Sequence, residues 1–264
     1  MKVRSVLNGI IATSLLTVAA QSAPAALVLR YDTWPAVGNS VTNTGTSATA
    51  GTLIGNTGGT TFPAGPDTLL SAHFNDGVGG NNNLGTGINT NKTLSSLSGG
   101  DSSFTAAAWV NLDDTNGDNM VFGTNGGNPM HLGFRGNSAY FGFWGNDSNS
   151  AGIATAGTWN YWTWRWNGAN GTQDIFENGA LVSSSGGHGN PFQGGENLTI
   201  GTNGGNSGDL NGGVDDVRFY NTALSNDAVV SDFRGALGTD IPEPATLGLA
   251  GIGLFGAFAR RRKA

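Results

Sequence analysis

The stretch Phe104-Thr105-Ala106-Ala107-Ala108-Trp109-Val110 decides the fold, because its side chains follow the two-residue period of a β-strand. The same period recurs in residues 139–144 (AYFGFW) and 198–201 (LTIG). Apart from one short segment, the region between the two ends of the chain shows no sustained helical spacing of apolar residues. These patterns predict a domain built from many short strands.

Glycine and asparagine separate the strand-like segments, and glycine alone accounts for 45 of the 264 residues. Asn116-Gly117 and Asn178-Gly179 are typical of tight hairpin turns, because both residue types accept the positive φ that these turns need. Strands joined by such turns are antiparallel. We therefore expect an all-β fold, either a sandwich or a barrel.

One segment departs from the strand pattern. Between Ser225 and Phe233, Ala228, Val229 and Phe233 have helical spacing. We expect one or two helical turns there, with these three side chains facing inward.

The N-terminus has the three parts of a signal peptide: the basic residues Lys2 and Arg4, an apolar run over 6–20, and small residues up to position 26. Ala23-Pro24-Ala25 forms an A-x-A cleavage site, so we assign residues 1–25 to the signal peptide, with cleavage after position 20 or 22 as alternatives. An uncleaved anchor is the other interpretation, but the run is short for a membrane span.

The C-terminus, residues 241–264, contains Ile241-Pro242-Glu243-Pro244, an apolar stretch over 245–259, and the closing cluster Arg260-Arg261-Arg262-Lys263. A basic cluster after an apolar run marks the cytoplasmic side of a membrane segment. These three parts, in this order, resemble the PEP-CTERM sorting signal. The resemblance implies a Gram-negative-type bacterium that makes exopolysaccharide, and an exosortase that recognises the tail before it is removed. Membrane attachment through residues 245–259 would then be transient.

The charge of the exported chain limits its partners. The formal net charge is −6, and six of the twelve Lys and Arg residues lie in the two terminal segments. Without these two segments, which also contain Glu243, the charge falls to about −11, which disfavours binding to nucleic acid and to anionic lipid but tolerates Ca²⁺. The chain contains no cysteine, so disulfides and thiolate sites are excluded.

The order of segments between the two ends resembles the laminin-G-like domains of the concanavalin A-like jelly-roll class. Residues 27–32 (LVLRYD) look like the opening strand of such a domain, and the element at 157–162 has Tyr161 where the family usually has His. The resemblance implies one antiparallel β-sandwich over residues 26–238, with hydrophobic helices only in the signal peptide and the sorting tail. The matching segments are 104–111 (FTAAAWVN), 121–123 (VFG), 157–162 (GTWNYW), 175–179 (IFENG), 198–201 (LTIG) and 213–225 (GVDDVRFYNTALS).

Aromatic residues supply the candidates for ligand binding. In a strand, Trp162, Trp164 and Trp166 share one face and Tyr161 and Arg165 share the other. The tryptophans either fill the space between two sheets, which we favour, or form a stacking surface for sugar rings. With those three tryptophans assigned to the core, the candidates for ligand binding are Trp144, Tyr161 and Arg165.

One loop offers a candidate calcium site. Asp114, Asn116 and Asp118 place oxygen donors at positions 1, 3 and 5 of a loop, a spacing that suits a hard cation. However, the loop has Asn119 where an EF-hand loop has Gly, and Asn125 where it has a bidentate acid. A polar hairpin loop is the alternative.

Asp215 is a second calcium candidate. Strict alternation places it on one face with Val217 and Phe219, opposite Asp216, and a carboxylate on an apolar face needs a partner. That partner would be a backbone N–H, an arginine or Ca²⁺, with Asp32 as co-ligand if the first and last strands are neighbours.

The sequence argues against catalysis. Glycosidases of the laminarinase type within this fold carry E-x-D-x-x-E on one strand, because hydrolysis needs two carboxyl groups flanking the scissile bond. The only glutamates here are Glu177, Glu196 and Glu243, and they are far apart. Motifs for serine hydrolases, zinc peptidases and phosphate-binding loops are also absent.

We therefore expect a non-catalytic protein of the cell envelope, outer surface or extracellular matrix that binds a polysaccharide or a surface protein. No cofactor other than Ca²⁺ is suggested. The alternatives are a purely structural matrix protein and a glycoside hydrolase.

Overall fold

The computed structural model describes residues 25–34, 38–55, 60–67, 69–74, 85–99, 102–124, 129–143, 145–150, 152–189, 196–203 and 208–238. The predicted terminal helices and the sorting tail lie outside these residues, as does the predicted signal peptide except for Ala25. No helix in the described part of the chain is long and apolar enough to span a membrane.

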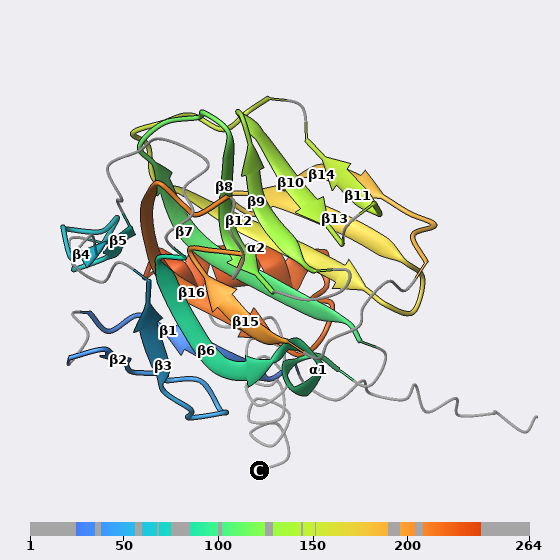
Figure 1. Ribbon diagram of the computed structural model, residues 1–264. Coiled ribbons are helices and arrows are strands. Elements are labelled where there is room, and N and C mark those ends of the chain that lie inside the picture. The colour runs from blue at the N-terminus through green and yellow to red at the C-terminus, as the bar shows by residue number, and fades with distance from the viewer. Residues whose placement is uncertain are drawn as a thin grey trace, which may run out of the picture.

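Two antiparallel sheets pack face to face (Figure 1). Among the described residues, the first sheet, sheet A, has eight strands. Seven follow one path, and β1 (Leu27–Tyr31) joins it by pairing with β16. The order along the path is β14 (Ala180–Ser185), β13 (Thr172–Glu177), β12 (Asn160–Asn167), β7 (Phe104–Leu112), β16 (Gly212–Tyr220), β5 (Ala72–Phe74) and β4 (Thr60–Thr61).

Sheet B also has eight strands in the described residues, and all of them follow one path. A four-residue helix, α1 (Leu94–Leu97), follows β6 directly. The strand order is β11 (Asp147–Asn149), β10 (Ser138–Gly142), β9 (His131–Arg135), β8 (Asp118–Gly123), β15 (Asn197–Ile200), β6 (Gly87–Thr93), β3 (Gly51–Ile54) and β2 (Ser40–Val41).

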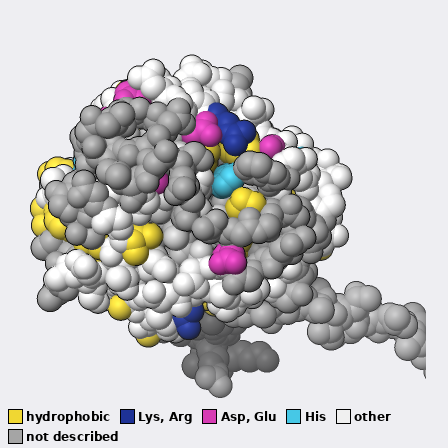
Figure 2. Space-filling model, viewed as in Figure 1, with side chains coloured by type: hydrophobic (Ala, Val, Ile, Leu, Met, Phe, Trp, Pro, Cys, Tyr) yellow, Lys and Arg dark blue, Asp and Glu magenta, His cyan; other side chains and the backbone are white. Residues whose placement is uncertain are grey.

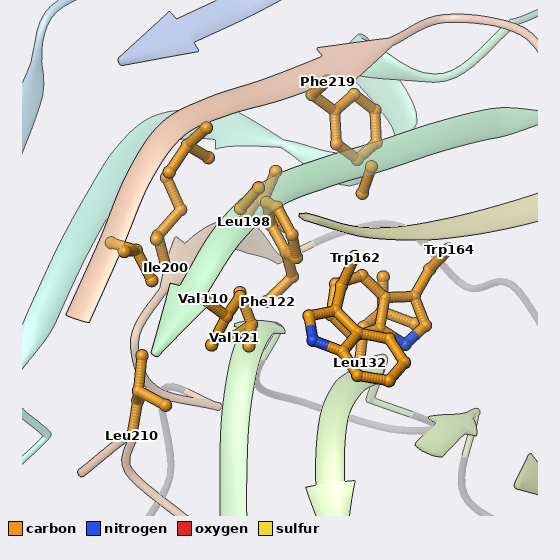
Figure 3. Close-up of a cluster of buried hydrophobic side chains, with 14 of the residues drawn as sticks. Val110, Val121, Phe122, Leu132, Trp162, Trp164, Leu198, Ile200, Leu210 and Phe219 are labelled. Carbon is orange, nitrogen blue, oxygen red and sulfur yellow. The ribbon is translucent and has the colours of Figure 1, made fainter. Parts of the chain in front are cut away.

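The core lies between the sheets and takes up the tryptophans of β12. Trp162, Trp164 and Trp166 are at most 2% exposed, which confirms the core interpretation of that face. Trp162 and Trp164 stack with centroids 6.4 Å apart, and Phe134 of sheet B meets Trp162 edge-on at 5.1 Å. Figure 3 shows both indoles beside Leu132. Burial of each ring contributes about 2–3 kcal/mol.

The predicted hairpin at Asn178-Gly179 is confirmed. It joins β13 to β14, and both turn residues have positive φ, 51° and 78°. This geometry is that of the primed turn whose twist matches that of the flanking strands.

Helix α2 (Asn226–Ala236) is longer than the one or two turns that we expected. Ser225 caps it by accepting a hydrogen bond from the backbone N–H of Ala228. Figure 1 shows α2 packed on sheet A, on the side away from sheet B. Its inward side chains complete two outer clusters, one with Trp109 and Tyr161 and one with Phe176.

A β-bulge in β16 overturns the alternation expected for Asp215. Asp215 pairs with Trp109 and Arg218 pairs with Ala107, so two residues of β16 oppose one of β7. Val214 and Val217 therefore both enter the core, whereas Asp215 lies opposite a residue of the outer cluster. Asp216, inside the bulge, has a φ of +38°. The prediction that Asp215 shares a face with Val217 and Phe219 was wrong.

Candidate binding face

The outer face of sheet B carries a cluster of polar and charged side chains on β8, β9, β10 and β11. In the described part of the chain, no helix packs over this cluster, in contrast to sheet A. Figure 2 shows a histidine close to basic and acidic side chains on this side of the molecule. This cluster, which we call the binding face, consists of Asp118, His131, Arg135, Tyr140 and Asp147.

Arg135 and Tyr140 form the centre of the binding face. Tyr140 lies in β10 opposite Gly133 of β9. Arg135 lies two residues further along β9 and is therefore on the same face of the sheet. The guanidinium carbon of Arg135 lies 3.8 Å from the centroid of the Tyr140 ring. The phenol is thus covered, at 3% exposure, while 42% of the arginine side chain remains exposed. Arg135 therefore presents hydrogen-bond donors to solvent from a stacked position.

The phenol hydroxyl has its own supporting contacts. A β-carbon on Gly142 would lie 2.5 Å from the Tyr140 hydroxyl and 2.6 Å from Asp147 Oδ1, so only glycine leaves room for this pair. Burial raises the pKa of Tyr140, and the hydrogen bond to Asp147 raises it further. Tyr140 is therefore a neutral donor at any physiological pH.

Asp118 and His131 complete the cluster. Asp118 forms an ion pair with Arg135, with 3.4 Å between Oδ2 and Nε. Burial lowers the pKa of His131, and the nearby Arg135 lowers it further. The imidazole is therefore uncharged at neutral pH, and the face combines one exposed cation with two carboxylates.

This arrangement suits a ligand rich in hydroxyl groups. Guanidinium donors and carboxylate acceptors stand side by side on a rigid sheet, so both hydrogen-bonding needs of a sugar hydroxyl are met. Sequence reasoning missed Arg135 and Tyr140. The signal was present in residues 139–143, where Tyr140 and Gly142 alternate with the core residues Ala139, Phe141 and Phe143.

The predicted ligand residues are not brought together. Tyr161 is fully buried beneath α2, where its hydroxyl donates to Asp232 Oδ2 at 2.6 Å. Arg165 donates to Asp174 Oδ2 at 2.7 Å and to the carbonyl of Leu224 at 2.6 Å. Both side chains anchor the loop and helix after β16, which corrects their assignment to a ligand-binding surface. Trp144 lies outside the described residues.

The loop proposed for calcium is held by its own hydrogen bonds. Asp114 accepts from the backbone N–H of Asn116 at 2.8 Å and from the amide of Asn211 at 3.0 Å. Asp118 instead pairs with Arg135. In the described part of the chain, no group of three or more His, Cys, Asp or Glu residues has a geometry that could hold a metal. Calcium at this loop stays a prediction.

Asp32 and Asp215 have different partners. Strands β1 and β16 are neighbours, as the calcium hypothesis required. However, Asp32 pairs with Arg30 at 3.2 Å, whereas Asp215 Oδ1 accepts from Trp34 Nε1 at 3.1 Å and from the N–H of Asp216 at 2.8 Å. These hydrogen bonds give Asp215 the partners that the structural alternative requires, and calcium at Asp32 and Asp215 stays a prediction.

A cavity of about 480 Å³ lies beside α2 and the start of β1. Its polar walls include Arg218, Tyr220 and Asp232, which already bond to one another. Arg218 also pairs with Asp216. These groups stabilise the helix on the sheet and leave few hydrogen-bonding positions for a ligand.

Two antiparallel sheets packed around one core, with a polar cluster on the outer face of one of them, define a β-sandwich of the lectin-like jelly-roll class. The family model of the concanavalin A-like lectin/glucanases superfamily matches residues 81–230, and the chain belongs to this superfamily. The model of the PEP-CTERM protein-sorting motif matches residues 240–263. That motif implies export, sorting to the cell envelope of a Gram-negative-type bacterium, and processing by an exosortase. Both family resemblances expected from the sequence are thereby confirmed.

Solved structures share the fold at low identity. Domain 4 of the extracellular arabinanase AbnA from Geobacillus stearothermophilus, in complex with arabinotriose, has a TM-score of 0.60 at 18% identity, over 79% of this chain and 98% of that one. Trypanosoma rangeli sialidase has a TM-score of 0.57 at 14% identity, over 82% and 34%. The binding domain of Paraclostridial Mosquitocidal Protein 1 has a TM-score of 0.53 at 14% identity, over 80% and 52%. No curated protein matches the sequence.

Proposed function

We propose that this protein is an exported, non-catalytic module of the cell surface or extracellular matrix, which binds a polysaccharide through the binding face of sheet B. Its tail holds it in the membrane until an exosortase removes that segment. The observation that supports the binding role most directly is the stacked pair of Arg135 and Tyr140 on a sheet face that no described helix covers.

The chemistry of the face favours binding over hydrolysis. Glycoside hydrolysis needs one carboxylic acid to protonate the leaving group and a second carboxylate on the other side of the bond. Asp118 is paired with Arg135, and Asp147 accepts from Tyr140. Each carboxylate thus has a partner that fixes it as an acceptor, a role that suits recognition of hydroxyl groups.

A specific observation also favours the structural alternative. Of the tryptophans in the described residues, only Trp159 is more than 8% exposed. The aromatic residues therefore mainly stabilise the sandwich, and a matrix protein without a discrete ligand would have the same core.

Binding assays on the exported protein separate the two functions. We expect a set of oligosaccharide probes, including arabinotriose and fragments of bacterial exopolysaccharide, to yield at least one ligand. Arg135→Ala should then weaken its affinity about tenfold, which corresponds to about 1.4 kcal/mol, because the exposed guanidinium donors are lost. Titration calorimetry measures the affinity of the original protein and of the variant. Each titration is done with and without Ca²⁺.

Arg234→Ala is the matched control, because Arg234 lies in the last turn of α2 on the opposite side of the sandwich. It removes the same charge and should leave affinity unchanged. Equal losses in both variants would mean that only net charge matters. Absence of binding to every probe would favour the purely structural function.

A further inference from the structure

The last turn of α2 ends in exposed apolar surface. Leu237, the residue after the helix, is 49% exposed. Trp159 and Phe233 are only partly buried and pack against the outer cluster that contains Ala236, the residue before Leu237. The benzene edge of Trp159 lies over Gly213, where a β-carbon would come within 2.7 Å of the ring. We call Trp159, Phe233 and Leu237 the apolar end.

The apolar end is fixed firmly to sheet A. Asp232 of α2 accepts from Arg218 Nη1 at 2.7 Å and from the Tyr161 hydroxyl at 2.6 Å, and these groups are all buried. One turn later, Trp109 Nε1 donates to the carbonyl of Ala236 at 3.4 Å. Because the helix is held by buried charges and by packing, its C-terminal end has a fixed place on the domain.

The chain that follows is too short to let this end face away from a membrane. The sorting motif matches from residue 240, and the apolar stretch begins at Ala245. Seven residue steps from Gly238 to Ala245 span at most about 25 Å, of which about 5–7 Å crosses the lipid headgroups. A compact domain of this size has a radius of gyration of about 17 Å. The roughly 18–20 Å of tether that remain above the headgroups are about one radius of gyration, which is too short to pass around the domain.

We propose that, until the tail is removed, the apolar end rests on the lipid surface, with Trp159 and Leu237 at the boundary between headgroups and acyl chains. Tryptophan prefers this boundary because its ring is amphipathic. The contact is apolar, since the acidic domain as a whole is repelled by anionic lipid. This inference rests on the proposed membrane attachment of the tail and is independent of polysaccharide binding. It implies that the exosortase meets its substrate with this end of the domain against the membrane.

The absence of cysteine from the chain permits a direct test. Leu237→Cys in the full chain is labelled with the polarity-sensitive fluorophore NBD and reconstituted into phosphatidylcholine vesicles. We expect a severalfold rise and a blue shift in its emission relative to detergent-free buffer. Asn149→Cys, on an exposed strand of sheet B, is the matched control and should show neither change. A long Gly-Ser insert after Gly238 should reduce the Leu237 signal, because it lengthens the tether.

Each outcome decides one claim. If the labelled protein floats with the vesicles but the Leu237 probe emits like the Asn149 probe, the apolar end does not meet the lipid and the inference is wrong. If the protein does not float, the tail attachment fails and the inference falls with it, while polysaccharide binding by the same protein is still measured separately. Quenching of tryptophan fluorescence by brominated lipid checks the result without a label. This quenching should be weaker in Trp159→Phe.

Discussion

Asp215 is a carboxylate that the fold has taken out of water without giving it a cation. It is 4% exposed, and its hydrogen bonds come from an indole and a backbone amide. Burial raises its pKa to about 6, although both hydrogen bonds act in the opposite direction. The ionised form is thus less favourable in the folded protein than in the unfolded chain.

This shift predicts a defined pH dependence of stability. Because the folded-state pKa of about 6 lies above the ordinary value of 3.8, the folded protein binds the proton more tightly. The free energy of unfolding should therefore be highest below about pH 4 and fall, through this group, as the pH rises to about 6. Asp215→Asn keeps the acceptor oxygen and removes the charge. It should abolish this component and stabilise the protein at pH 7 by up to about 3 kcal/mol.

Urea unfolding of both proteins from about pH 4 to about pH 7 measures the effect. The two stability curves should converge at the acidic end and separate toward neutrality. Parallel curves would show that Asp215 titrates normally.

At the level of single residues, the sequence showed that Asp215 needs a partner but could not show which one. The partner, Trp34, lies 181 positions away, and the bulge that turns Asp215 outward depends on pairing with β7. For the same reason Tyr161 and Arg165 were assigned to a surface, since their burial depends on a helix more than 50 residues later.

Helix α2 is the element whose position depends most on buried charge. Arg218 donates to Asp216 and to Asp232, while Asp232 also accepts from two tyrosine hydroxyls. Arg30 supplies a second cation to Asp216 at 2.9 Å. This network ties β1, β16 and α2 to one another outside the main core.

Arg218→Met should be severely destabilising, because it leaves Asp216 and Asp232 buried with too few cations. We expect a loss of about 3–5 kcal/mol. Arg234→Met, in the exposed last turn of the same helix, should cost less than about 1 kcal/mol. Thermal or denaturant unfolding compares the two. A loss in Arg218→Met no larger than in the control would mean that the network contributes little.

Most elements were predictable because their signals are local. The strands at 104–110 and 198–201, the Asn178-Gly179 turn and the start of α2 at Ser225 all follow from short-range pattern and capping. The full length of α2 and the binding face were not predictable. Both depend on which faces of distant strands are covered. No short stretch of the sequence contains that information.

For the whole molecule, the first described strand begins close to the proposed signal-peptide cleavage site. Ala25 is exposed, whereas the backbone of Ala26 already pairs with Asn221, donating to its Oδ1 at 3.0 Å and accepting from its N–H at 3.2 Å. Cleavage after Ala25 would keep the Ala26 backbone that pairs with Asn221.

Intact-mass and N-terminal analysis of the exported protein tests this proposal. We expect the chain to begin at Ala26, with its new amino group donating a hydrogen bond to the side chain of Asn221. A chain beginning at residue 21 or 23 would place the cleavage at one of the alternative sites. One that retains residues 1–25 would show an uncleaved anchor.

The central place of β16 has a consequence for secretion. Ala26 and Asn221 are 195 positions apart, and β16 lies between β7 on one side and β1 and β5 on the other. A polypeptide that crosses the translocon from its N-terminus has residues 44–47 to bond to β1, but β1 lacks its partner strand β16 until residue 220 has emerged. Such long-range pairing is slow to form. The topology thus delays closure of the sandwich until threading is nearly complete, which keeps the chain in the extended state that a secretion channel accepts.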